Sequence, residues 1–217
     1  MILGSISING ILPGNNQSAR GIYHFSQKKQ TMALYASNML HRIDNSYFLY
    51  HLQTPIIASR TAAFTNSHVF PSGENAIVAL GSYFGFNQED STVINETATD
   101  IGFLRATTLK KQKEEIKKNP ASAQTGQFMK PSKDKFSDMR QDVNYDKLTE
   151  KGYAKENTYI QDKDAIIGIG TPKPISSSDD KPFKDSSIIY KTIIKGAIDK
   201  VVICTNNEDY PLIKMRI

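Results

Sequence analysis

Residues 71–105 form the stretch that decides the fold, PSGENAIVALGSYFGFNQEDSTVINETATDIGFLR. The apolar run 76–83 lies between the turn signals Pro71-Ser72-Gly73 and Phe86-Asn87-Gln88-Glu89-Asp90, and this pattern predicts a β-strand. Glu89 and Asp90 would then follow the end of a strand, where paired carboxylates can meet a divalent metal ion or a nucleotide. From the pattern alone, a capped turn with two solvated acids is the favoured interpretation.

Short strands are expected on both sides of this stretch. One or two are expected within residues 1–12, and others at 56–59, 93–95, 165–169, 187–194, 200–204 and 212–217. Two segments are predicted to be helical. Residues 18–40 have apolar residues at three- and four-residue spacing behind a possible N-cap at Asn15 or Asn16, and residues 109–118 are predicted to form a short charged helix. The fold class expected is therefore α+β and β-rich.

The composition is that of an ordinary globular protein. The chain has 217 residues, 39% of them apolar and 23% charged, with ten Tyr and ten Phe available for burial. This excludes a disordered protein, and no apolar run is long enough to span a membrane. A single cysteine, Cys204, excludes a disulfide framework and a cysteine-rich zinc site. The first residues lack the features of a secretory signal peptide, so no secretion is expected.

The positive charge is concentrated in the middle of the chain. Residues 106–155 carry twelve basic and seven acidic residues, which accounts for the whole net charge of +5. A solvated insertion is the first interpretation of such a segment, and a contact with nucleic-acid phosphates is the second.

Two other patterns were weighed as functional sites. Gly168-Ile169-Gly170 follows a predicted strand, but Thr171-Pro172 follows in place of a helix, so a dinucleotide-binding loop is rejected. The four histidines, His24, His41, His51 and His68, have no metal-binding spacing and are interpreted as structural.

Four blocks of residues, in order along the chain, carry a family resemblance. They are Asn16-Gln17-Ser18-Ala19-Arg20 with Lys29-Gln30, the opening stretch 71–105, the segment 145–172, and the segment 196–216. The blocks resemble the second-largest subunit of multisubunit DNA-directed RNA polymerases, in its eukaryotic, archaeal and large-DNA-virus form. In that family the strongest block has the form PxGxNAIVA, GYNQEDS and DRGxFR.

The resemblance implies an architecture. Residues 1–105 would be part of the hybrid-binding region and contribute to a double-psi β-barrel. Residues 106–217 would be the inserted wall or flap β domain, with the basic insertion 106–155 near nucleic acid. In that setting, the phosphate contact becomes the favoured interpretation of the basic segment.

The resemblance also implies roles for particular residues in a nucleotidyltransferase. Arg20 would clamp the triphosphate, and Glu89 and Asp90 would help hold a second Mg²⁺ that is shared with another chain. The residues that would line the RNA–DNA hybrid are Gln17, Lys29 and Gln30. The isolated chain is expected to be inactive and poorly soluble.

The implied partners are the largest polymerase subunit, the remaining parts of the second-largest subunit, the DNA template with its RNA–DNA hybrid, and nucleoside triphosphates, with no membrane. The implied location is intracellular: the nucleus, or a viral factory or virion. Ala19 and Ile101 replace a proline and an arginine of the family pattern, which indicates a divergent branch. A composition rich in Asn, Lys and Ile indicates a large-DNA-virus enzyme. A split-gene product and a partial reading frame both fit the chain, and a non-catalytic nucleic-acid-binding module derived from such a polymerase is the alternative function.

Overall fold

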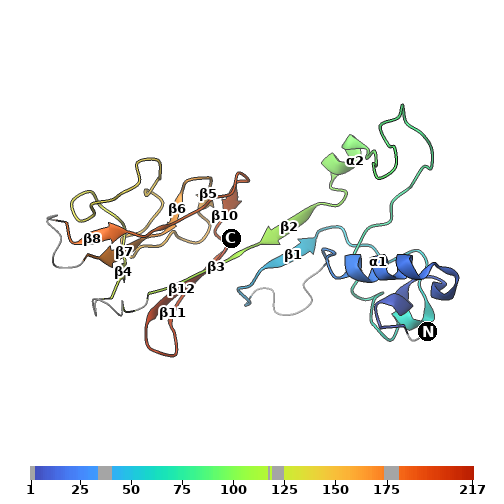
Figure 1. Ribbon diagram of the computed structural model, residues 1–217, viewed down its shortest axis with the longest axis horizontal. Helices are drawn as coiled ribbons and strands as arrows, with labels where there is room; N and C mark the ends of the chain where they lie inside the picture. The colour runs from blue at the N-terminus through green and yellow to red at the C-terminus, as the bar shows by residue number, and fades with distance from the viewer. Residues whose placement is uncertain (1–2, 34–40, 117, 119–124, 174–180) are drawn as a thin grey trace. The chain divides into compact units, whose positions relative to one another are not determined.

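The computed structural model describes residues 3–33, 41–116, 118, 125–173 and 181–217 (Figure 1). The chain divides into two compact units. Unit 1 comprises Met1–Arg42 and Ser46–Thr108, and unit 2 comprises Ile43–Asn45 and Leu109–Ile217. No helix in the described ranges has the length and apolar character needed to cross a bilayer.

Unit 1 is built mainly from short helices and irregular segments. Its helical elements are the 3₁₀ turns η1 (Ser7–Asn9), η2 (Pro13–Asn15) and η3 (Arg60–Ala62) and the α-helices α1 (Ser18–Lys28) and α2 (Glu96–Ile101). The strands β1 (Ser46–Leu49) and β2 (Ala106–Leu109) pair as a two-stranded sheet. The side chain of Asn95 caps α2 by accepting from the backbone N–H of Ala98. Gly102 ends this helix at φ 120°, a backbone conformation that glycine adopts readily.

Unit 2 is a set of small antiparallel sheets. Its strands are β3 (Lys111–Glu115), β4 (Gln127–Phe128), β5 (Tyr159–Ile160), β6 (Ala165–Ile167), β7 (Ile169–Pro172), β8 (Phe183–Asp185), β9 (Ile188–Ile189), β10 (Gly196–Ala197), β11 (Lys200–Thr205) and β12 (Pro211–Arg216). The three-stranded sheets have the orders β11-β12-β3 and β4-β7-β8, and β5 pairs with β10 and β6 with β9. Figure 1 shows β11 and β12 as a hairpin. None of the sheets that the structure describes closes into a barrel.

The core of unit 2 is apolar and closely packed. Its main cluster consists of Ala154, Ile160, Ile166, Ile167, Tyr190, Ile198, Ile213 and Met215. The strands lie close together at Gly168, where an added Cβ would lie 2.3 Å from the carbonyl oxygen of Met129. Close packing therefore accounts for this glycine without a phosphate-binding loop.

Unit 1 has almost no core of this kind. Among its described hydrophobic residues only Leu49 and Ala62 are buried. Many large apolar side chains face solvent instead, and Ile77 and Leu80 are essentially fully exposed. A surface of this size and composition is expected where a protein contacts another chain.

The strand predictions for unit 1 are wrong. Residues 56–59, 76–83 and 93–95 contain no strand, and residues 7–9 form a 3₁₀ turn. Among the described residues, these segments have no neighbouring strand to supply backbone hydrogen bonds, and a strand needs such a partner.

The helix predictions are wrong at several points. The helix predicted over 18–40 ends at Lys28, where Gln30 N–H donates to the carbonyl of Gln27 and Thr31 Oγ1 donates to that of Lys28. Residues 34–40 of this predicted helix lie outside the described residues. Neither predicted asparagine caps α1. Gln17 occupies the N-cap without a side-chain hydrogen bond, and Asn16 donates to the carbonyls of Ile11 and Leu12.

The charged segment 109–118 is a strand where a helix was predicted. Residues 111–115 form β3, which pairs with β12 from Leu212 opposite Glu115 to Arg216 opposite Lys111. Tertiary pairing here outweighs the helix propensity of Lys and Glu.

The strand predictions in unit 2 are confirmed. β6 and β7 occupy residues 165–172 with a break at Gly168, β9 lies within 187–194, and β11 and β12 cover the last two predicted strands. The chain is β-rich with few helices, as the composition and pattern predicted.

Candidate functional site

Helix α1 positions two of the predicted residues, Gln17 and Arg20, at its start. The carbonyl of Gln17 accepts from the N–H of Arg20 (3.0 Å), and both side chains are exposed. The guanidinium carbon of Arg20 lies 5.7 Å from the ring centroid of Tyr23. A cation–π contact uses none of the N–H donors, so the N–H groups of Arg20 remain available to an anion.

Lys29 and Gln30 follow the end of the same helix. The ammonium of Lys29 lies 3.8 Å from the ring centroid of Phe25, and both Lys29 and Gln30 are exposed. Contacts of this kind leave a cationic group at the surface with only partial compensation of its charge.

Glu89 and Asp90 lie in an irregular turn held by Asn87. The Asn87 side chain accepts from the N–H of Tyr83 (2.8 Å) and donates to the carbonyl of Gly81 (2.6 Å). Ser91 N–H then donates to the carbonyl of Gln88, and Glu89 between them has φ 47° in the left-handed region. Both carboxylates are exposed and form no ion pair with any described residue.

The predicted residues thus fall into two groups within unit 1. Gln17, Arg20, Lys29 and Gln30 lie on or beside α1, whereas Glu89 and Asp90 share one turn. No hydrogen bond or ion pair joins Arg20 to Glu89 or Asp90 among the residues that the structure describes. In the described ranges, no group of three His, Cys, Asp or Glu residues could hold a metal ion. Two adjacent, unpaired carboxylates fit a part of a Mg²⁺ site whose other ligands come from elsewhere.

The basic segment 106–155 is only partly irregular. Lys111 and Lys113 alternate along β3 and are exposed, and Lys113 lies 3.8 Å from Glu115. Lys117 lies outside the described residues. Lys133 and Lys135 are exposed in the turn that precedes the buried Phe136.

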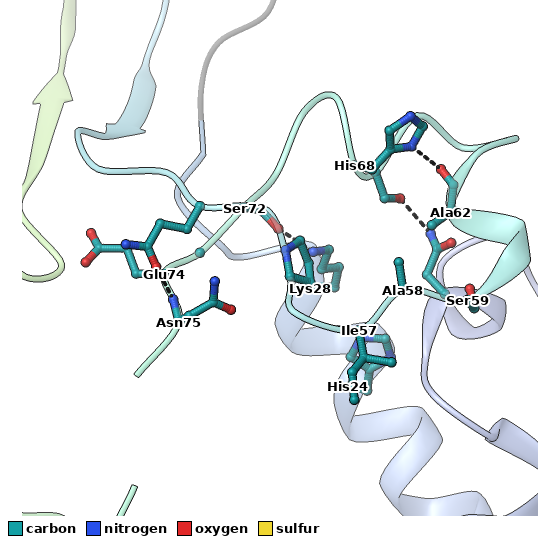
Figure 2. Close-up of a pocket in the computed structure, with 15 residues that line it drawn as sticks. His24, Lys28, Ile57, Ala58, Ser59, Ala62, His68, Ser72, Glu74 and Asn75 are labelled. Atoms are coloured by element: carbon teal, nitrogen blue, oxygen red, sulfur yellow. Dashed lines mark hydrogen bonds between the residues drawn. The ribbon is translucent and has the colours of Figure 1, made fainter. Parts of the chain in front are cut away.

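Unit 1 also contains a pocket, lined by both polar and apolar residues, that the sequence did not predict. The pocket has a volume of about 290 Å³ and lies between α1 and the segments 53–62 and 67–75 (Figure 2). Its lining includes His24, Lys28, His68 and Ser72. The spacing of His24 and Lys28 at i and i+4 is the signal that the sequence offers for this pocket, and the structural interpretation of His24 does not use it.

Comparison with known proteins decides the family. A family model described as RNA polymerase Rpb2, domain 6, matches residues 7–217. The chain belongs to this family. The match extends through both units and includes all six predicted site residues.

Individual Rpb2 relatives agree with this assignment along the full chain. The chain is 54% identical over 218 residues to DNA-directed RNA polymerase subunit 2 of Acanthamoeba polyphaga mimivirus. It is 32% identical over 222 residues to DNA-directed RNA polymerase II subunit 2 of Arabidopsis thaliana, and 29% identical over 222 residues to DNA-directed RNA polymerase subunit Rpo2 of Sulfolobus acidocaldarius.

These relatives are much longer than the domain described here. Each alignment covers 100% of this chain, but only 18% of the mimivirus and Arabidopsis proteins and 20% of the Sulfolobus protein. The chain therefore spans about a fifth of the length of the Rpb2-type subunits that it matches.

Proposed function

We propose that this Rpb2 domain works within a DNA-directed RNA polymerase, where unit 1 lines the RNA–DNA hybrid and the nucleotide site during template-directed RNA synthesis. The observation that carries the proposal is the family match over residues 7–217. The exposure of all six predicted site residues agrees with it, since residues that contact a ligand must be accessible before it binds.

The reaction is attack of the RNA 3′-hydroxyl on the α-phosphate of a nucleoside triphosphate, with pyrophosphate as the leaving group. Arg20 would donate hydrogen bonds to phosphate oxygens. A planar guanidinium can do this with two parallel N–H groups, which the point charge of a lysine cannot reproduce. Arg20 would hold the triphosphate in position and compensate its charge.

Glu89 and Asp90 would supply carboxylate oxygens to a Mg²⁺ ion shared with the largest subunit. When bound, Mg²⁺ stabilises the attacking and leaving oxygens. The turn held by Asn87 would keep both carboxylates at the surface, directed toward ligands from the other chain.

The remaining contacts would be with nucleic acid and with other parts of the enzyme. The hybrid would meet Gln17, Lys29 and Gln30, and phosphates would meet the lysines of segment 106–155. We further propose that unit 1 contributes to a double-psi β-barrel completed by the rest of the second-largest subunit, and that unit 2 is the wall. The assembled enzyme would act inside the cell, in the nucleus or in a viral factory or virion.

The test is a magnesium titration of the assembled polymerase carrying Asp90→Asn. Removing one carboxylate from a shared site should slow nucleotide addition and raise the magnesium concentration required, while assembly and hybrid binding stay intact. Glu89→Gln should act in the same direction with a smaller effect.

The matched control is Glu96→Gln, which removes another exposed carboxylate of unit 1. Its magnesium dependence should equal that of the unmodified enzyme. An unchanged magnesium dependence in both Asp90→Asn and Glu89→Gln would assign this pair to a solvated turn and refute its metal-binding role.

A further inference from the structure

The pocket beside α1 is held open by hydrogen bonds between segments that are distant in sequence. Asn75 N–H donates to Gln53 Oε1 (2.8 Å), and Asn75 Nδ2 donates to the carbonyl of Thr54 (2.9 Å). On the other side, Asn9 Nδ2 donates to Ser67 Oγ (3.0 Å). These hydrogen bonds therefore connect segments that surround a cavity in a unit with little apolar core.

The cationic and imidazole groups of the lining come from α1 and from the segment 67–75. Figure 2 shows Lys28 directed toward Ser72, to which its ammonium donates, and His24 one turn earlier on the same helix. An ammonium has three N–H donors, so two remain after this bond. The imidazole of His24 forms no hydrogen bond with any described residue.

The single acid of the lining is already engaged. Glu74 accepts from the backbone N–H of Leu104 (3.1 Å). The ammonium of Lys28 shares the lining with the imidazoles of His24 and His68, and His68 Nδ1 donates to the carbonyl of Ala62 (3.2 Å). The available groups therefore favour an anionic ligand that also offers polar atoms to imidazole and hydroxyl groups.

We infer that this pocket binds the phosphate group of a small phosphorylated ligand, with Lys28 and His24 as its principal contacts. The volume is at the lower end of the range for ligand sites, about 300 Å³, which suits a mononucleotide or a smaller phosphate compound. Pro55, Ile57 and Ala58 form an apolar side that a nucleoside could cover.

The inference does not depend on the triphosphate role of Arg20 or on the metal-binding role of Asp90, since neither residue lines the pocket. Failure of one proposal therefore leaves the other unaffected, and the two can be separated by variants of the same enzyme.

The experiment is equilibrium dialysis of the assembled polymerase, without nucleic acid, against radiolabelled pyrophosphate, AMP and adenosine. Lys28→Gln should weaken phosphate-dependent binding about tenfold, because it removes a charge-assisted contact. Lys28→Arg should restore most of the affinity, and His24→Gln should weaken it by a smaller factor. Arg60→Ala removes an exposed arginine of unit 1 that does not line the pocket, and it should leave this binding unchanged.

The three ligands distinguish the sources of the phosphate. Tighter binding of AMP than of pyrophosphate assigns the site to a nucleotide, and the reverse order assigns it to an inorganic phosphate compound. Binding of adenosine alone, no Lys28-dependent binding of any ligand, or an equal loss of binding in Arg60→Ala would overturn the inference. If the Lys28→Gln enzyme fails to assemble, His24→Gln takes its place in the experiment. Equal phosphate affinity of His24→Gln and the unmodified enzyme would also overturn the inference.

Discussion

Unit 1 and unit 2 are of similar size but are stabilised in different ways. In unit 2 the residues Ile160, Ile167, Ile198 and Met215 are almost completely buried, whereas in unit 1 the large apolar side chains are mostly exposed. Unit 2 therefore has the apolar core that allows a domain to fold by itself. Unit 1 has a polar network and an apolar surface, which are the properties of a segment that is completed by neighbours.

The six predicted site residues all lie in unit 1, the unit with few buried apolar side chains. Ligand-binding segments are commonly drawn from the parts of a protein that have few buried contacts, because they must adapt to a ligand or a partner. The comparison makes a general prediction: substitutions in unit 2 should change stability, and substitutions in unit 1 should change function.

The largest expected effect is a cavity in the core of unit 2. Ile167→Ala should lower the free energy of unfolding by about 2–5 kcal/mol, because Ile167 is fully buried. Urea unfolding followed by circular dichroism measures this. The matched control is Ile77→Ala in unit 1, where the side chain is fully exposed, and the change should stay within about 0.5 kcal/mol. Equal effects of the two substitutions would contradict the comparison.

The second prediction concerns the buried carboxylate of Asp164. Burial by itself raises the pKa of Asp164, but hydrogen bonds from Lys147 (2.5 Å), the N–H of Gln161 and the amide of Asn144 outweigh burial, so the pKa is lowered. A lowered pKa in the folded state gives stability that is present above the unfolded value, about 3.9, and is lost as the pH falls through the folded value.

Asp164→Asn should therefore lower the free energy of unfolding of unit 2 by about 2–3 kcal/mol at pH 7. Below about pH 4 the stability of the variant should fall less steeply with pH than that of the unmodified protein. Urea titrations at several pH values between 3 and 7 would measure both effects. Asp162→Asn, an exposed neighbour, is the control and should change neither. A variant that keeps the full acid sensitivity would refute the role assigned to Asp164.

The third prediction moves to unit 1. Arg20→Ala should raise the barrier for nucleotide use in the assembled polymerase by about 1.5–3 kcal/mol, and Arg20→Lys should recover only part of it. Unit 2 should unfold at an unchanged urea concentration. Arg60→Ala removes another exposed arginine of unit 1 and should elongate normally. Normal elongation by Arg20→Ala at limiting nucleotide would make Arg20 a surface residue.

The smallest expected effect concerns the support of the carboxylate turn. Asn87→Ala removes the hydrogen bonds with Tyr83 and Gly81 and should lower the free energy that stabilises this turn by about 0.5–1.5 kcal/mol. The magnesium concentration required for nucleotide addition should rise, though less than in Asp90→Asn. Gln88→Ala, in the same turn, should have no such effect. Identical magnesium curves for Asn87→Ala and the unmodified enzyme would show that the turn does not position the carboxylates.

The sequence predicted strands correctly where the chain itself supplies the strand that pairs with them. β11 and β12 were predicted from apolar runs, and they pair with each other across a short turn. The segment 76–83 has an equally strong strand pattern, but the described chain offers it no neighbouring strand. For β3 the local composition favoured a helix, and only its pairing with β12, about a hundred residues later, makes it a strand.

The candidate site was predictable to the extent that it follows a contiguous motif. Glu89, Asp90 and Arg20 could be named because their neighbours match the family pattern, and their roles remain predictions. The bonds of Asn87 that shape the turn depend on the backbone conformation. The pocket was not predictable from the sequence, because it joins α1 to residues about 30 to 50 positions later.

The central claim, that unit 1 is completed by neighbours and unit 2 is not, is tested most directly by hydrogen–deuterium exchange measured by mass spectrometry. The chain would be compared alone and within the assembled polymerase. In the free chain, β6, β11 and β12 should be protected while residues 76–94 exchange rapidly. Assembly should then protect 76–94 and leave unit 2 almost unchanged. Equal protection of 76–94 in the free chain and in the assembled enzyme would contradict the account.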